Sequence, residues 1–175
     1  MASSLAPTRY VPDVLDSPEP AIEAIDRAFA FLVDDYGFER VHPTSPRGEP
    51  VAPSAHARYE TSDACVQVTW FRGELEAYIG VRRRLWRDRS YMLAEVADLL
   101  EVRQELGPYP YYAHAPEELE RGVHQFARFV RTYGPRVWGH ADVQKHLAER
   151  QAALSREWTA YYSGKGPRPR TGKLP

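Results

Sequence analysis

The sequence predicts an α+β fold in which a small antiparallel sheet of three to four strands is packed by an N-terminal helix and three C-terminal helices. Within residues 55–82, apolar side chains recur at every second position, as they do in strands with one buried face. The flanking segments instead repeat their apolar side chains every three or four residues, which is typical of amphipathic helices. Such a sheet needs a cover for its apolar face, and these helices can supply it.

The composition indicates one globular domain. The chain has 175 residues, of which 43% are hydrophobic and 12% aromatic. We expect a single domain over residues 1–163, with a loose arm at 1–16 and a flexible basic tail at 164–175. The single cysteine, Cys65, excludes an intrachain disulfide and favours a reducing compartment. Because no long apolar run occurs, we expect no membrane span and a cytoplasmic location.

The first helix is expected to begin after Asp16. Ser17 suits the N-cap position and Pro18 the first helical position. Gly37 is expected to end the helix in a left-handed conformation, and a short strand is expected at residues 38–41. The side chains that recur along one face of this helix are Ile22, Ile25, Phe29, Leu32 and Tyr36.

Three further strands are expected at about residues 55–61, 65–71 and 74–82. The preceding segment, residues 42–54, contains four prolines and is expected to be a loop. Turn-forming residues separate the strands, at Ser62-Asp63 and Arg72-Gly73. The links are short, so antiparallel pairing is expected.

The C-terminal half is expected to contain three helices, at about residues 90–106, 116–133 and 141–162. Ser90 is a suitable N-cap for the first of them. The second is expected to stop at Gly134-Pro135, because both residues disfavour a continuing helix.

Charge is distributed unevenly along the chain, although the net charge is only −1. Residues 10–39 carry eight acids and one base, whereas residues 82–89 carry five arginines and one acid. Guanidinium groups suit carboxylates or phosphates, and a tryptophan among them can stack on a base. The segment therefore predicts an acidic protein partner or a nucleic acid, with ordinary solvated surface as the third interpretation. The residues concerned are Arg82, Arg83, Arg84, Trp86, Arg87 and Arg89.

A loop rich in proline and tyrosine, residues 107–116, is a second interface candidate. Its tyrosines, Tyr109, Tyr111 and Tyr112, offer large contact areas, and its prolines limit the unbound conformations. The alternative is that these tyrosines only cover an edge of the core.

No motif predicts catalysis, a cofactor or a metal site. The weak candidates for metal ligands are His140, Asp142 and His146, which no second cluster completes. A row of acids has the spacing of the solvent-facing side of a helix and comprises Glu95, Asp98, Glu101 and Glu105. Cys65 is expected to pack within a strand, and phosphate-binding glycine loops are absent from the sequence.

The first helix is expected to end in the sequence FLVDDYGF, residues 31–38, which is followed by strands with a V-x-V pattern. Over residues 21–106 this arrangement resembles small uncharacterised bacterial proteins, some of which look like immunity proteins of contact-dependent or polymorphic toxin systems. The resemblance implies a stoichiometric toxin-binding protein without catalytic residues.

From the sequence we therefore expect a non-enzymatic cytoplasmic protein-binding protein, and a toxin-neutralising immunity protein as its specific form. The alternative is a nucleic-acid-associated protein that uses residues 82–89. A small enzyme with a dispersed active site would require a pocket joining residues distant in the sequence.

Overall fold

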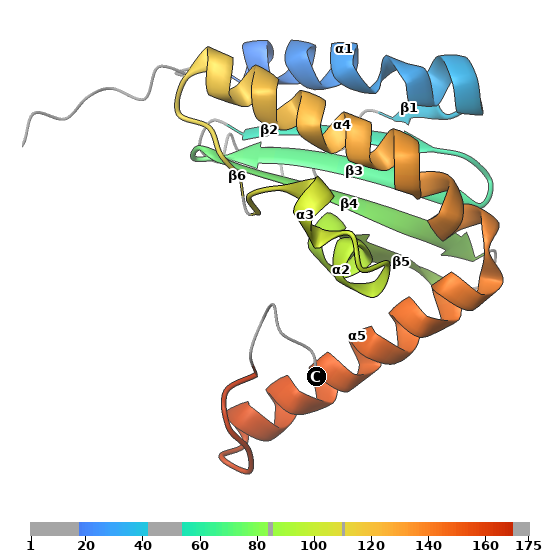
Figure 1. Cartoon of the computed structure of the whole chain (residues 1–175), viewed down its shortest axis with the longest axis vertical. Helices are drawn as coiled ribbons and strands as arrows, with labels where there is room; N and C mark the ends of the chain where they lie inside the picture. The colour runs from blue at the N-terminus through green and yellow to red at the C-terminus, as the bar shows by residue number, and fades with distance from the viewer. Residues whose placement is uncertain (1–17, 42–53, 84–85, 110, 170–175) are drawn as a thin grey trace, which may run out of the picture.

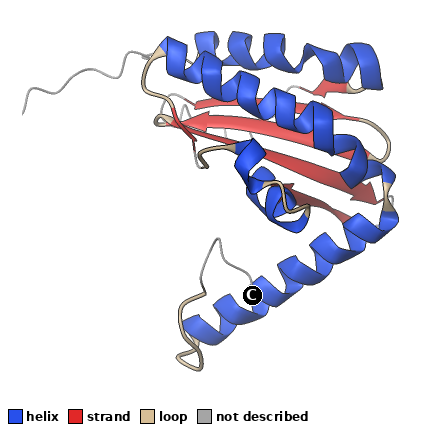
Figure 2. Cartoon of the chain, viewed as in Figure 1, coloured by secondary structure: helices blue, strands red, loops and turns tan. Residues whose placement is uncertain are grey.

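The fold is α+β and consists of an antiparallel sheet with helices on one side (Figures 1 and 2). The computed structural model describes residues 18–41, 54–83, 86–109 and 111–169. For residues 82–83 and 86–89 it describes only the backbone. The interpretations of residues 1–17, most of the loop at 42–54 and the end of the tail fall outside the described residues.

Each strand is antiparallel to its neighbours. The sheet has the order β1-β2-β3-β4-β5, and β6 pairs with β4 beside β5. The strands are β1 (Glu39–Val41), β2 (Ser54–Glu60), β3 (Ala64–Phe71), β4 (Glu74–Arg83), β5 (Trp86–Met92) and β6 (Tyr111–Tyr112). The helices are α1 (Glu19–Tyr36), α2 (Leu93–Leu99), α3 (Arg103–Leu106), α4 (Pro116–Gly139) and α5 (Ala141–Tyr162).

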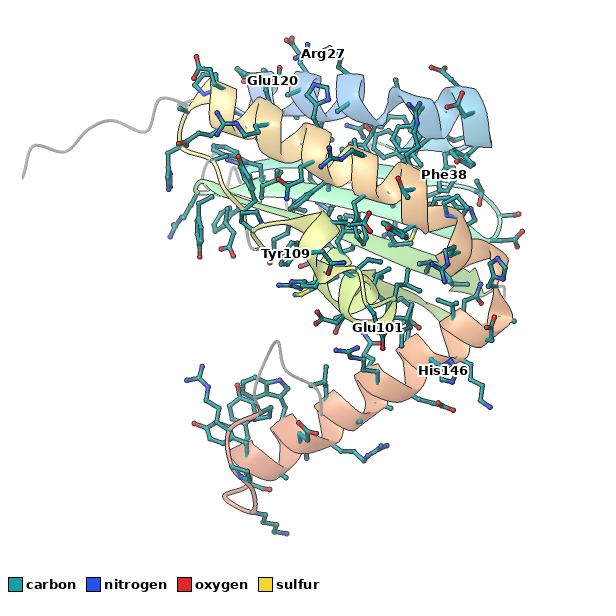
Figure 3. All side chains as sticks on the ribbon, in the orientation of Figure 1. Arg27, Phe38, Glu101, Tyr109, Glu120 and His146 are labelled. Atoms are coloured by element: carbon teal, nitrogen blue, oxygen red, sulfur yellow. The ribbon has the colours of Figure 1, made fainter. Side chains whose placement is uncertain are left out.

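The core lies between the sheet and the helices α1, α2 and α4. The predicted alternation is confirmed, because Val66, Val68 and Trp70 of β3 are all buried. Helices α1 and α4 lie side by side over the sheet (Figure 1), and Arg27 of α1 points toward Glu120 of α4, with which it forms an ion pair (Figure 3). The side chains that face away from these helices therefore form the second face of the sheet.

Helix α1 is held to the edge of the sheet by a polar network. The carboxylate of Asp26 accepts hydrogen bonds from Arg40 Nε of β1 at 2.7 Å and from the hydroxyl of Tyr59 of β2 at 2.6 Å. Burial, and then the hydrogen bond to Asp26, raise the pKa of Tyr59 well above its usual value. The predicted helix end is confirmed, since Gly37 has a φ of 67°.

The predicted turn between β3 and β4 is also confirmed. Arg72 and Gly73 have φ values of 50° and 85°, as expected for a two-residue turn whose twist matches that of the strands. This turn places Phe71 directly opposite Glu74. The register of the hairpin is therefore set by the turn.

Replacing Gly73 with alanine is expected to lower the free energy of unfolding by about 1–2 kcal/mol, because an L-residue is strained at this φ. The added Cβ would also lie 2.3 Å from the ring of His114, which must move. Gly139→Ala is the control, since beyond its chain neighbours and the adjacent helix backbone no described atom lies within 4 Å of its added Cβ. Urea denaturation of both variants measures the difference, and equal stabilities would contradict this account of the turn.

The structure corrects the predicted numbers of strands and helices. Residues 86–92 form strand β5, whereas a helix was expected from Ser90. The helix expected at residues 90–106 is divided into α2 and α3, and Glu101 between them has a left-handed φ of 58°. The sheet is therefore larger than predicted, and five helices pack against it or extend from it among the described residues.

Helix α4 continues through Gly134-Pro135, so the predicted stop is wrong. The ring of Trp138 packs over Gly134, so closely that a Cβ there would lie 2.3 Å from it. The same ring contacts Tyr36 and Phe38, with ring centroids 5.8 and 5.4 Å apart. These contacts with α1 and the following residues favour a continuous helix despite the missing backbone donor of proline.

Candidate interaction surface

The described ends of the arginine-rich segment lie on two paired strands. Residues 82–83 end β4, residues 86–89 begin β5, and Arg83 pairs with Trp86. The segment was expected to be a charged exit from the last strand, but its backbone returns along β4 as a further strand. The side chains of Arg82, Arg83, Arg84, Trp86, Arg87 and Arg89 lie outside the described part of the structure, and their binding role stays a prediction.

The three loop tyrosines occupy different environments. The ring of Tyr109 lies 5.6 Å from that of Phe126, and its hydroxyl is buried. Burial raises the pKa of Tyr109. Tyr111 is only 8% exposed and meets Phe126 edge-on, whereas Tyr112 is 59% exposed. Of the three, Tyr112 offers by far the most surface to a partner.

We call the side of the sheet opposite α1 and α4 the polar face. The described helices lie on the other side of the sheet or at its edge (Figures 1 and 2). Its side chains alternate with those of the core. They include His56, Arg58 and Glu60 from β2, Gln67, Thr69 and Phe71 from β3, Glu74, Glu76 and Tyr78 from β4, Met92 from β5 and Tyr112 from β6.

One end of the polar face carries an aromatic pair around a carboxylate. Glu74 pairs with Phe71 on one side and with Tyr112 on the other, so the three side chains form a line across β3, β4 and β6. We call this line the aromatic–acid row. Phe71 is 42% exposed and Tyr112 is 59% exposed. Glu74 has no ion pair with any described residue.

Two groups of the chain itself already lie on the rings of this row. The guanidinium carbon of Arg72 lies 5.1 Å from the ring centroid of Phe71. The ring of His114 stacks on Tyr112, with centroids 6.5 Å apart and an interplanar angle of 15°. The exposed rings of the row are therefore accessible to cationic and planar groups.

The middle of the polar face carries both charge signs. Tyr78 donates a hydrogen bond to Glu76 at 2.7 Å, and burial raises the pKa of Tyr78. Arg58 pairs with Glu60 in β2. Burial, followed by the nearby charges of Arg58 and Arg40, lowers the pKa of His56. Acidic groups thus follow β4, whereas the basic groups lie toward β2.

The predicted acidic row on α2 and α3 has structural contacts. Glu95 accepts a hydrogen bond from the backbone N–H of Met92 at 2.9 Å, and burial raises its pKa. Asp98 lies 3.5 Å from Arg150 of α5 and 3.8 Å from Arg103. The pair of Asp98 and Arg150 connects α5 to α2.

The metal-ligand candidates from the sequence, His140, Asp142 and His146, do not form a metal site in the described part of the chain. No group of three His, Cys, Asp or Glu side chains among the described residues is placed to hold a metal ion. His146 lies on the exposed side of α5 (Figure 3). A cavity of about 190 Å³ between α3 and α4 is smaller than the roughly 300–1,000 Å³ of typical small-molecule sites. It is lined by Gln104, Glu105, Arg128, Phe129, Thr132 and Tyr133.

The aromatic–acid row was not predicted. The two-residue turn at Arg72-Gly73 is sufficient to place Phe71 opposite Glu74, so half of the row could have been read from the sequence. The pairing of Tyr112 with Glu74 depends on tertiary contacts of the loop.

Comparisons with protein-family models, curated proteins and solved structures find no match to this chain. In the described part of the chain, no helix has the length and apolar character needed to span a membrane.

Proposed function

We propose that this protein binds another protein through the polar face of its sheet, and that it acts as a toxin-neutralising immunity protein. The observation that carries the proposal is a sheet face that no described helix covers. On it, the exposed rings of Phe71 and Tyr112 accompany Glu74 and Glu76, two carboxylates without a cationic partner among the described residues. Aromatic side chains supply much of the binding energy in protein interfaces, and charges that pair with those of the partner make the interface specific. The immunity role is what the resemblance over residues 21–106, with its motif at residues 31–38, implies.

The size of the polar face supports a protein ligand. Strand β3 has eight residues and β4 has ten. With a rise of about 3.4 Å per residue and a spacing of about 4.8 Å, the strands of the main path present about 600 Å². A standard protein interface buries about 800 Å² per partner. The polar face with the adjoining β6 is therefore large enough to form most of such an interface.

The proposal is tested by placing a bulky charge in the middle of the polar face. Thr69 lies between His56 and Glu76 in the register of the sheet, so Thr69→Arg would obstruct a partner on this side. Thr132→Arg introduces the same side chain at an exposed position of α4 and serves as the control. Tagged protein is recovered from the source cells and analysed by native mass spectrometry.

The unmodified protein and Thr132→Arg are expected to retain a stoichiometric protein partner. With Thr69→Arg, the amount of partner recovered is expected to be at least about tenfold lower. Circular dichroism confirms that each variant is folded. Equal recovery with both variants, or the absence of any stable protein partner, would contradict the proposal.

The second candidate is binding of nucleic acid, favoured by the position of the ends of the arginine-rich segment on two paired strands. A two-stranded ribbon can enter the major groove of duplex DNA. Contacts with phosphates would make the affinity fall steeply as salt increases. A DNA or RNA titration at several salt concentrations therefore separates this function from binding to a protein.

A further inference from the structure

We propose that the aromatic–acid row is a recognition site for a cation, and that it receives a lysine or arginine side chain of the protein partner. The inference rests on the proposed function and specifies the chemistry of the partner at one end of the polar face. A carboxylate between two exposed rings offers both an ion pair and contact with aromatic rings to the same cation.

The spacing of the row suits a single cationic side chain. Phe71 and Tyr112 stand on the strands that flank β4, with Glu74 between them. Neighbouring strands are about 4.8 Å apart, so the two aromatic residues are separated by about 9–10 Å at the backbone. With the two rings facing each other across β4, about 6 Å would remain after their thickness is subtracted, which would accommodate one alkylammonium or guanidinium group above Glu74.

The electrostatics of the row also favour a cation. Glu74 has no ion pair among the described residues, and Glu76, two residues further along β4 on the same face, pairs only with the hydroxyl of Tyr78. The nearby guanidinium of Arg72 lies over Phe71 and forms no salt bridge with Glu74. The negative charge therefore remains available to a partner, although Arg72 lies on the ring of Phe71 and His114 on that of Tyr112.

Arg72 provides an internal test of the chemistry. Its guanidinium shows that a cation is accommodated on the ring of Phe71, and the same group would compete with the cation of a partner. Asparagine tolerates the φ of 50° found at this turn position. Arg72→Asn should therefore preserve the hairpin and strengthen the binding of an added cation, which a purely structural role of the row would not explain.

The experiment is a titration of the ¹⁵N-labelled full chain followed by nuclear magnetic resonance. The probes are N-acetyl-lysine methylamide, N-acetyl-arginine methylamide and N-acetyl-Nε-acetyl-lysine methylamide, the last of which keeps the lysine stem but lacks the charge. We expect the two cationic probes to shift the amide signals of Phe71, Glu74 and Tyr112. The neutral probe should bind at least about tenfold more weakly. The ratio of the two cationic affinities identifies the preferred side chain.

Variants connect the shifts to the row. Glu74→Gln keeps the size of the side chain and should weaken binding about tenfold. Tyr112→Leu should weaken it about two- to fivefold, and Arg72→Asn should strengthen it by a similar factor. Glu117→Gln, at an exposed position in the first turn of α4, is the control and should bind as the unmodified protein does.

Equal binding of the charged and neutral lysine probes would overturn the inference, as would full affinity in Glu74→Gln. If Thr69→Arg disrupts a protein complex while the cationic probes fail to bind the row, this inference fails and the proposed function stands. If the probes bind the row but no protein partner exists, the proposed function fails and the cation site stands.

Discussion

Replacing Phe126 with alanine is expected to lower the free energy of unfolding by about 3–5 kcal/mol, as for other fully buried phenylalanines. Phe126 is 0% exposed and projects from α4 toward the sheet. Its ring lies 5.6 Å from that of Tyr109 and 6.4 Å from that of Tyr111. Truncation thus opens a cavity beneath the tyrosine loop. Urea denaturation measures the loss, and Phe126→Leu, which fills more of the space, should cost less than half as much.

The same substitution should disturb the candidate site. Strand β6 contains only two residues, and its position depends on Tyr111 packing against α4 and on the hydrogen bond from Ala113 N–H to the carbonyl of Gly73, at 2.7 Å. Without Phe126, the amide hydrogens of β6 should exchange faster than those of β3. If the β6 amides keep their protection while the domain is destabilised, Tyr111 does not position β6 through Phe126.

The features predicted well from the sequence are those determined locally. Alternating side chains identified β3 and most of β4, and Arg72-Gly73 determined their register, because side-chain period and turn geometry are both encoded within a few residues. The apolar face of α1 and its end at Gly37 are likewise determined by residues close together in the sequence. For these elements, tertiary packing reinforces the intrinsic preference of the chain.

The elements missed by sequence analysis depend on distant contacts. Strand β5 carries Arg and Asp between its apolar residues, so its pairing with β4 leaves little alternating pattern to detect. Helix α4 passes through Pro135 because Trp138 is packed against Tyr36 and Phe38, which lie about a hundred residues earlier. The aromatic–acid row likewise depends on β6, whose two residues give no detectable strand period.

Stability is expected to fall steeply above pH 10. Burial raises the pKa values of Tyr59, Tyr78 and Tyr109 above the usual tyrosine value of 10.0. The folded protein therefore keeps these hydroxyls neutral at pH values where the unfolded chain releases their protons. Their contribution is fully present below pH 10 and is lost as the pH rises from there toward the folded-state pKa values. For each tyrosine that is protonated in the folded protein but ionised in the unfolded chain, the free energy of unfolding falls by at most about 1.4 kcal/mol per pH unit. The half-buried Tyr78 contributes less than this.

Tyr59 should account for a measurable share of this alkaline sensitivity, because it is buried and donates a hydrogen bond to Asp26 at 2.6 Å. Tyr59→Phe removes this hydrogen bond, so the free energy of unfolding should be lower by about 1–2 kcal/mol at pH 7. The variant also lacks the ionisable hydroxyl, so its free energy of unfolding should decline less steeply between pH 10 and 11. Tyr162→Phe is the control, since that side chain is 79% exposed, and it should leave the slope unchanged. Urea denaturation at successive pH values measures each slope. Identical slopes for Tyr59→Phe and the unmodified protein would mean that Tyr59 ionises in the folded state as readily as in the unfolded chain, and that the polar network joining α1 to the sheet does not hold its hydroxyl neutral.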